Sequence, residues 1–312
     1  MVKRTAGIHH ITAIVGNPQE NVDFYASVLG LRLVKKTINF DDPGTYHLYF
    51  GNEGGDPGTI ITFFPWDNAY KGRIGDGQVG ITSYAVPAGA LGFWEERLAH
   101  YQVDYEKASR FGESSLRFDD PHGLHLEIVE RSMGELNSWS FNGVKREAAI
   151  KGFAGATLFT SRAEKTAELL EQVLGFEKVG EEGEFIRFRS TAEIGNMIDV
   201  KTTSSGTGQM GVGTVHHIAW RAMDDADQLD WKNEIEAYGL GVTPVQDRSY
   251  FNAIYFREYG DLLFEIATDP PGFAIDESPE SLGESLMLPK RYEQYRSGLM
   301  NDLMPIKVRE LE

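Results

Sequence analysis

Cysteine is absent from this chain of 312 residues. The absence excludes disulfides, thiolate nucleophiles and zinc-thiolate sites, so any metal ion must be held by histidine, aspartate or glutamate. Basic residues are also scarce, because 30 Lys and Arg stand against 47 Asp and Glu and give a formal net charge of −17. A surface this acidic repels nucleic-acid phosphates and anionic lipid headgroups. We therefore expect neither nucleic acid nor a membrane as a partner.

Long hydrophobic runs are missing as well. No apolar stretch approaches the ~18 residues that a membrane-spanning helix needs, and residues 1–7 contain no hydrophobic signal core. We expect a cytoplasmic protein. The chain is nevertheless 41% hydrophobic and carries 18 Phe, 5 Trp and 13 Tyr. At about twice the ~150-residue prior for one domain, it has enough residues for two cores or for a set of repeats.

A unit of one strand, one amphipathic helix and three further strands recurs four times. One such unit exposes a sheet face that it cannot bury alone, so the units must pair into cupped sheets with helices outside. The sequence thus predicts an α+β fold of four βαβββ modules that form two cupped, pseudo-barrel units. The predicted parts are module 1 (1–76), module 2 with a linker (77–150), module 3 (151–212), module 4 (213–269) and a C-terminal extension (270–312) with a terminal helix at 288–304.

Superposing the four modules in register brings a potential metal site together. The position of His10 falls on Ile81, Gly155 and His217 in the other modules. In the closing strand, Glu265 falls on Glu127, Asp199 and, in module 1, on Thr62 or Phe63. Pairing module 1 with module 4 therefore collects His10, His217 and Glu265 in one cup, whereas pairing neighbouring modules leaves one histidine per cup.

Two histidines and one carboxylate leave about three positions open on an octahedral ion, a pattern typical of non-heme Fe(II) oxygenases. We predict that module 1 pairs with module 4, and module 2 with module 3. The cup of modules 2 and 3 offers carboxylates without imidazole and is expected to hold no iron. Strand parity assigns His10 and His217 to the inner face, and His9 and His216 to the helix-covered face. His9 shares its face with the apolar series Ile11, Ala13 and Val15, whereas His10 shares its face with Thr12.

Four segments of the chain also resemble those of a known protein family. The segments are GIHHITAIV, GTVHHIAWRA, DRSYFNAIYFRE and LLFEIATD. In these segments the chain resembles the vicinal oxygen chelate superfamily, and more narrowly the ring-cleaving dioxygenases of hydroquinone type. The resemblance covers nearly the whole chain. It implies an extradiol-type dioxygenase that uses Fe(II), with Mn(II) as an alternative ion, to open a hydroquinone or catechol ring with O2 in detoxification or aromatic degradation. It places the ligands on His10, His217 and Glu265.

Ring cleavage needs a base for a phenolic proton and hydrogen-bonding groups around the ring. The candidates are His9, His216, Arg248 and Tyr255 as catalytic residues and Thr12 as a substrate-binding residue, each weighed against a purely structural role. His47 is interpreted as a packed strand residue, and the spacing of His122, His125 and Glu127 as a weak metal pattern.

Two other functions remain open on the same fold. One is a glyoxalase-type metal lyase or isomerase, which would supply a fourth protein ligand where this chain has Thr62 or Phe63. The other is a protein that sequesters a small molecule without chemistry, which needs no ligand histidines. The sequence does not identify the aromatic substrate, and it leaves a homo-oligomer open.

Overall fold

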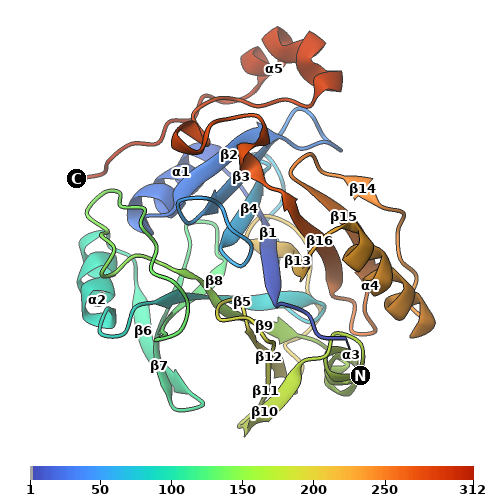
Figure 1. The fold of residues 1–312 in the computed structure, drawn as a ribbon. Helices are drawn as coiled ribbons and strands as arrows, with labels where there is room; N and C mark the ends of the chain where they lie inside the picture. The colour runs from blue at the N-terminus through green and yellow to red at the C-terminus, as the bar shows by residue number, and fades with distance from the viewer. Residues whose placement is uncertain (1–2) are drawn as a thin grey trace.

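The computed structural model describes residues 3–312, whose strands form two eight-stranded sheets (Figure 1). The first sheet joins the strands of modules 4 and 1 in the order β14-β15-β16-β13-β1-β4-β3-β2. The second joins modules 3 and 2 in the order β10-β11-β12-β9-β5-β8-β7-β6. The predicted fold class and the pairing of module 1 with 4 and of 2 with 3 are therefore confirmed.

The elements follow the predicted repeat in each module. Module 1 contains β1 (Ile8–Val15), α1 (Pro18–Val22), the π-helical turn η1 (Asp23–Val28), β2 (Arg32–Ile38), β3 (Tyr46–Gly51) and β4 (Ile60–Pro65). Module 2 contains β5 (Gln78–Val86), α2 (Leu91–His100), β6 (Tyr105–Arg110), β7 (Glu113–Asp119) and β8 (His125–Glu130). Module 3 contains β9 (Gly152–Phe159), α3 (Ala163–Gln172), β10 (Glu177–Glu182), β11 (Phe185–Arg189) and β12 (Met197–Lys201). Module 4 contains β13 (Thr214–Ala222), α4 (Asp225–Ala237), β14 (Gln246–Asp247), β15 (Phe251–Arg257) and β16 (Leu263–Pro271).

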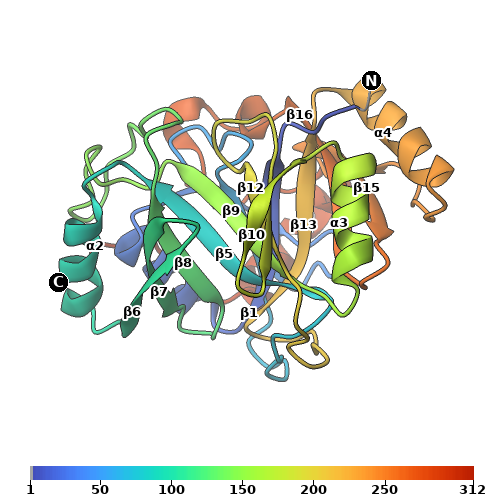
Figure 2. The ribbon, with the colours of Figure 1, turned by 90° about the horizontal axis from the view of Figure 1, so that it is seen from below.

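The helices begin and pack as local chemistry dictates. In α1, the Asn17 side chain accepts hydrogen bonds from the backbone N–H groups of Gln19 and Glu20, and Pro18 occupies the first helical position. In α4, Trp231 and Ile235 are buried toward β13, β15 and β16. Figure 2 shows α2 at one side of the molecule and α3 and α4 at the other, outside the strands. The helices therefore cover the outer faces and leave the inner faces of the sheets to form the cups.

The two middle strands of each sheet fix which side chains meet. Strands β1 and β13 run antiparallel in the first sheet, as do β5 and β9 in the second. Each first strand also pairs in parallel with the last strand of its own module, through Thr12 with Thr62, Ser83 with Glu127, Thr157 with Asp199, and Ala219 with Glu265. These four equivalent pairs reproduce the register deduced from the repeats and select Thr62 over Phe63 as the counterpart of Glu265.

The C-terminal extension differs from the single helix expected at 288–304. It contains three short 3-10 turns, η2 (Phe273–Ile275), η3 (Pro279–Ser281) and η4 (Lys290–Tyr295), and the helix α5 (Arg296–Asp302). No residue of η4 or α5 is buried, so these turns gain little from packing, which supplies most helix stability in proteins. The extension is anchored instead by Lys35 in β2, whose Nζ lies 2.6 Å from carboxylate oxygens of both Asp276 and Glu277. Within residues 3–312, no helix is both long and apolar enough to span a bilayer.

Candidate metal centre

A cavity of about 330 Å³ opens on the inner face of the first sheet. Its walls combine aromatic rings with histidine and a few charged groups. The lining residues are His10, Asn39, Phe40, Asp41, Asp42, His47, Tyr49, Phe64, Trp66, His216, His217, Arg248, Phe251 and Tyr255. Modules 1 and 4 both contribute, so the cavity exists only because the two ends of the chain form one sheet.

Three buried side chains converge at this cavity from three strands. The Nε2 atoms of His10 in β1 and His217 in β13 lie 3.3 Å apart. The Oε2 atom of Glu265 in β16 lies 3.4 Å from His10 Nε2 and 2.8 Å from His217 Nε2. Among residues 3–312, this is the group of His, Asp and Glu side chains that is compact enough to hold one ion.

The surroundings of Glu265 suit a bound cation. Both of its carboxylate oxygens are buried, and neither accepts a well-formed hydrogen bond from the described residues. Burial raises the pKa of a carboxyl, but His10 and His217 hold the pKa of Glu265 well below its usual value. A buried carboxylate without hydrogen bonds is costly, and a metal ion compensates it. Two imidazole nitrogens and this oxygen are a donor set that could hold one divalent transition-metal ion.

The first histidine of each pair is not on the helix-covered face, so the parity assignment of His9 and His216 was wrong. The pairing of β1 with β13 shifts by one residue at His9 and again at His216, and each shift is a β-bulge. A bulge breaks the alternation of side chains and redirects one of them. His216 consequently lines the cavity, and His9 packs on the ring of Phe251, which also lines it.

The bulges belong to the fold rather than to the histidines. In the second sheet, the pairing of β5 with β9 shifts at the equivalent residues Gly80 and Ala154. The framework therefore offers two redirected positions in each cup, and this chain fills them with imidazole in one cup only.

Each redirected histidine contacts its neighbouring ligand. The Nδ1 atoms of His9 and His10 lie 2.9 Å apart, and those of His216 and His217 lie 2.7 Å apart. With Nε2 of each ligand facing the centre, its Nδ1 carries the ring proton and donates it to the neighbour, an arrangement that fixes the orientation of a metal ligand. Burial and the adjacent histidine lower the pKa of His216 to about 3 and that of His9 well below its usual value, so both rings are neutral acceptors.

The position equivalent to Glu265 in module 1 is filled by a hydroxyl that has other partners. Thr62 Oγ1 lies 2.8 Å from both Thr12 Oγ1 and His47 Nε2. Thr12, the predicted substrate-binding residue, is fully buried and is not among the residues that line the cavity. His47, interpreted from sequence as a packed strand residue, lines the cavity, and its Nδ1 lies 2.8 Å from the Tyr49 hydroxyl.

Tyr255 and Arg248, the catalytic candidates on the segment before Glu265, both line the cavity. Tyr255 pairs directly with Glu265 across β15 and β16, and its hydroxyl accepts a hydrogen bond from Arg248 Nε at 3.2 Å. Burial, reinforced by the Glu265 charge, raises the pKa of Tyr255 well above its usual value. The Tyr255 hydroxyl therefore keeps its proton and can donate it to an oxygen in the cavity.

The sequence analysis missed the aromatic walls formed by Phe64, Trp66 and Phe251. Phe64 follows Thr62 by two residues in β4 and so shares its face, which is a signal that parity could have used. Phe251 begins β15, and its distance from the ligands in sequence gives no such signal.

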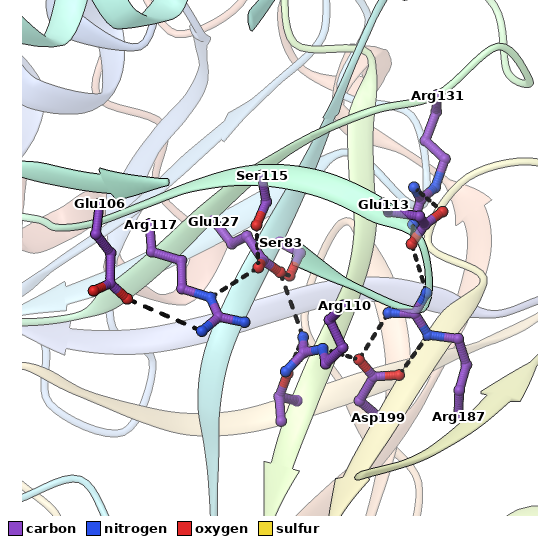
Figure 3. Close-up of polar contacts among 11 residues, drawn as sticks. Ser83, Glu106, Arg110, Glu113, Ser115, Arg117, Glu127, Arg131, Arg187 and Asp199 are labelled. Atoms are coloured by element: carbon purple, nitrogen blue, oxygen red, sulfur yellow. Dashed lines mark hydrogen bonds and ion pairs between the residues drawn. The ribbon is translucent and has the colours of Figure 1, made fainter. Parts of the chain in front are cut away.

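The second cup holds ion pairs at the equivalent positions (Figure 3). Asp199 accepts two hydrogen bonds from Arg187, at 2.7 and 2.9 Å, and lies 2.9 Å from Arg110 Nε. Glu127, the counterpart of Glu265, accepts from Ser83, Ser115 and Arg117. Its carboxylate is thus committed to protein donors instead of facing an imidazole pair.

The weak metal pattern of His122, His125 and Glu127 does not assemble. His125 Nδ1 lies 2.6 Å from Asp119, and His122 contacts the backbone N–H of Gly16. Glu127 belongs to the ion-pair cluster just described. The three side chains therefore have separate partners.

Known proteins of similar sequence and structure match this chain over nearly its whole length. The chain is 67% identical over 312 residues, all of both chains, to "Putative ring-cleaving dioxygenase MhqO" from Bacillus subtilis (strain 168). It is 36% identical to "Chlorohydroquinone/hydroquinone 1,2-dioxygenase" from Sphingobium indicum, over 96% of this chain and 97% of that one. The chain also superposes on the crystal structure of a "putative dioxygenase from Bacillus subtilis subsp. subtilis str. 168". The TM-score is 0.98 at 67% identity, over 99% of this chain and all of that one.

A more distant structure shares the fold alone. Glyoxalase I from Zea mays superposes with a TM-score of 0.63 at 12% identity, over 84% of this chain and 92% of that one. The family model described as "Glyoxalase/Bleomycin resistance protein/Dioxygenase superfamily" matches residues 7–128 and 152–276. The first match covers modules 1 and 2, and the second covers modules 3 and 4. The chain therefore belongs to the glyoxalase, bleomycin resistance protein and dioxygenase superfamily.

Proposed function

We propose that this chain is a non-heme Fe(II)-dependent, extradiol-type dioxygenase that cleaves the ring of a hydroquinone- or catechol-type aromatic compound. The observation that carries the proposal is the buried group of His10, His217 and Glu265 at an aromatic-lined cavity, with a hydroxyl instead of a fourth strong ligand. The names of the two curated relatives point to the same reaction class.

The three ligands would hold Fe(II), or Mn(II) as an alternative ion, through His10 Nε2, His217 Nε2 and a Glu265 carboxylate oxygen. When bound, the ion supplies Lewis acidity toward a phenolic oxygen and the electron transfer that the reaction with dioxygen requires. His9 and His216 keep the two ligand imidazoles oriented through their Nδ1 contacts. His10 and His217 keep the pKa of the Glu265 carboxyl low against the effect of burial, whereas burial lowers the pKa of His9 and His216 and keeps those rings neutral.

The remaining lining residues would orient the aromatic ring and control its proton. Phe64, Trp66 and Phe251 offer flat apolar surfaces that exclude water from the ring. The Tyr255 hydroxyl donates to a substrate oxygen, and the Arg248 guanidinium beside it stabilises negative charge as the phenol ionises. A phenol with a reference pKa near ~10 needs such help to ionise at neutral pH.

The glyoxalase-type alternative requires a fourth strong ligand, and the Thr62 hydroxyl is already hydrogen-bonded to Thr12 and His47. This arrangement leaves a coordination position for substrate or dioxygen. It supports oxygen chemistry over a metal lyase or isomerase on the same fold.

Anaerobic reconstitution with Fe(II), followed by metal analysis and oxygen uptake on a panel of hydroquinones and catechols, tests the proposal. We expect about one Fe(II) per chain and oxygen consumption on at least one member of the panel. The variants His10→Ala, His217→Ala and Glu265→Ala should each lose the iron. Glu127→Gln, at the equivalent position of the second cup, is the matched control and should retain it. Two iron equivalents per chain, or full iron content in His217→Ala, would refute the site.

A further inference from the structure

The cavity has a charged rim. The charged lining residues are Asp41 and Asp42, in the loop between β2 and β3, and Arg248, which follows β14. The Asp41 side chain is 75% exposed, so its carboxylate faces the solution from which a substrate arrives. Modules 1 and 4 thus meet at the rim as well as at the ligands.

The guanidinium at this rim is already paired. Arg248 Nη1 lies 3.0 Å from the Asp41 carboxylate, and Arg248 Nε donates to the Tyr255 hydroxyl. A guanidinium recognises an anionic substituent best when two of its N–H groups are free to make a forked contact. Tyr255 engages Nε and Asp41 engages Nη1, so each forked edge of the Arg248 guanidinium already has one nitrogen in use, which weakens its contact with an incoming carboxylate.

The second carboxylate is held at the rim by its own hydrogen bonds. Asp42 Oδ2 accepts from Trp66 Nε1 at 2.7 Å and from Thr45 Oγ1 at 2.9 Å. These neutral donors fix the position of the carboxylate without cancelling its charge. The cavity lining therefore carries one guanidinium and two aspartate carboxylates, in a protein whose formal net charge is already −17.

We propose that Asp41 and Asp42 are specificity-determining residues that select uncharged aromatic diols over ring carboxylates and other anionic rings. The proposal rests on the proposed function for the identity of the substrate and adds the charge that the site accepts. Like charges at the rim raise the free energy of an entering anion, whereas they leave a neutral ring of the same shape unaffected. Asp41 acts in two ways, because it repels an anion directly and also occupies Arg248.

A pair of ligands that differ mainly in charge isolates this effect. The probes are 2,5-dihydroxybenzamide, which is neutral, and 2,5-dihydroxybenzoate, which is anionic. Isothermal titration calorimetry under nitrogen, with the full chain and without added metal, measures binding free of turnover. The metal-free arm is needed because an ortho hydroxyl and carboxylate together chelate a metal and would mask repulsion at the rim, and a parallel arm with Fe(II) reports the size of that contribution.

We expect the unmodified chain to bind the amide at least about 5-fold more tightly than the benzoate. Asp41→Asn should reduce this ratio about 5-fold and Asp42→Asn about 2-fold, as suits partly exposed charges. Raising the salt concentration should also shrink the ratio, because exposed charges are screened. Glu171→Gln removes the same charge from the exposed surface of α3 and should leave the ratio unchanged.

Equal affinities for the two probes, or a ratio that Asp41→Asn leaves unchanged, would overturn the inference. A Glu171→Gln variant that lowers the ratio as much as Asp41→Asn would also overturn it, because net charge rather than the rim would then be responsible. Oxygen uptake on unsubstituted hydroquinone is measured separately. Failure of that reaction with a normal shift in the binding ratio refutes the dioxygenase proposal and leaves charge selection supported.

Discussion

Arg187 offers a direct test of what the buried ion pairs of the second cup contribute to stability. Its guanidinium makes two hydrogen bonds with Asp199, at 2.7 and 2.9 Å, and a third contact with Glu113 at 2.5 Å. The side chains of Arg187 and Asp199 are only 8% and 4% exposed, so solvent screens their interaction weakly. Substitution to methionine keeps most of the volume but leaves Asp199 with Arg110 as its remaining cation.

Breaking a buried ion pair by removing one partner costs about 3–5 kcal/mol. Because Arg110 still faces Asp199, we expect Arg187→Met to lower the free energy of unfolding by about 3 kcal/mol, at the low end of that range. In a chain of 312 residues, the loss corresponds to a fall in Tm of roughly 5 °C. Removal of Asp199 as well should recover part of the loss, because the uncompensated carboxylate is the main source of the cost.

The assay is urea unfolding followed by circular dichroism, with a thermal melt as a second measurement. Arg189→Met is the matched control, since Arg189 lies in the same strand, is 48% exposed and pairs with Glu177 at the surface. We expect it to change stability by less than ~0.5 kcal/mol. Both variants should have the same iron content as the unmodified chain, because the proposed metal site is in the other cup. The reasoning is refuted if Arg187→Met unfolds within ~0.5 kcal/mol of the unmodified chain.

Three further predictions follow from the structure. Tyr255→Phe should lower kcat about 10²-fold with iron content unchanged, because it removes only the donated hydroxyl, and the exposed Tyr259→Phe should be neutral in the same oxygen-uptake assay. Burial opposes ionisation of Glu127, but Arg110 and hydroxyl donors lower its pKa in the folded chain below the unfolded-state pKa of about 4.3. The stability that the charged carboxylate adds is therefore present above that pH and is lost as the pH falls further. Urea titrations from pH 6 to 3 should show that the difference in free energy of unfolding between the unmodified chain and Glu127→Gln becomes smaller. Residues 1–145 expressed alone should neither bind iron nor fold stably, because β1 and β5 lose their partners β13 and β9, which circular dichroism and metal analysis will show.

The repeat pattern in the sequence by itself determined which modules pair and which side chains meet. Four copies of one unit, with histidine at the equivalent first-strand position only in modules 1 and 4, sufficed to pair these two modules and to align His10, His217 and Glu265. The sequence indicates the register here because the four repeats provide four copies of the same strand pairing, which can be aligned on one another. The absence of cysteine restricted the donor set further.

The tertiary structure alone decided how the neighbours of the ligands are used. Parity sent His9 and His216 to the wrong face because it assumes an uninterrupted ladder, and the two bulges between β1 and β13 depend on pairing across about 200 residues. The cavity role of His47 likewise depends on Thr62 in an adjacent strand. Strand periodicity is local and therefore readable, whereas bulges, cavity walls and the rim pair of Asp41 with Arg248 come from contacts between distant segments whose geometry no local pattern encodes.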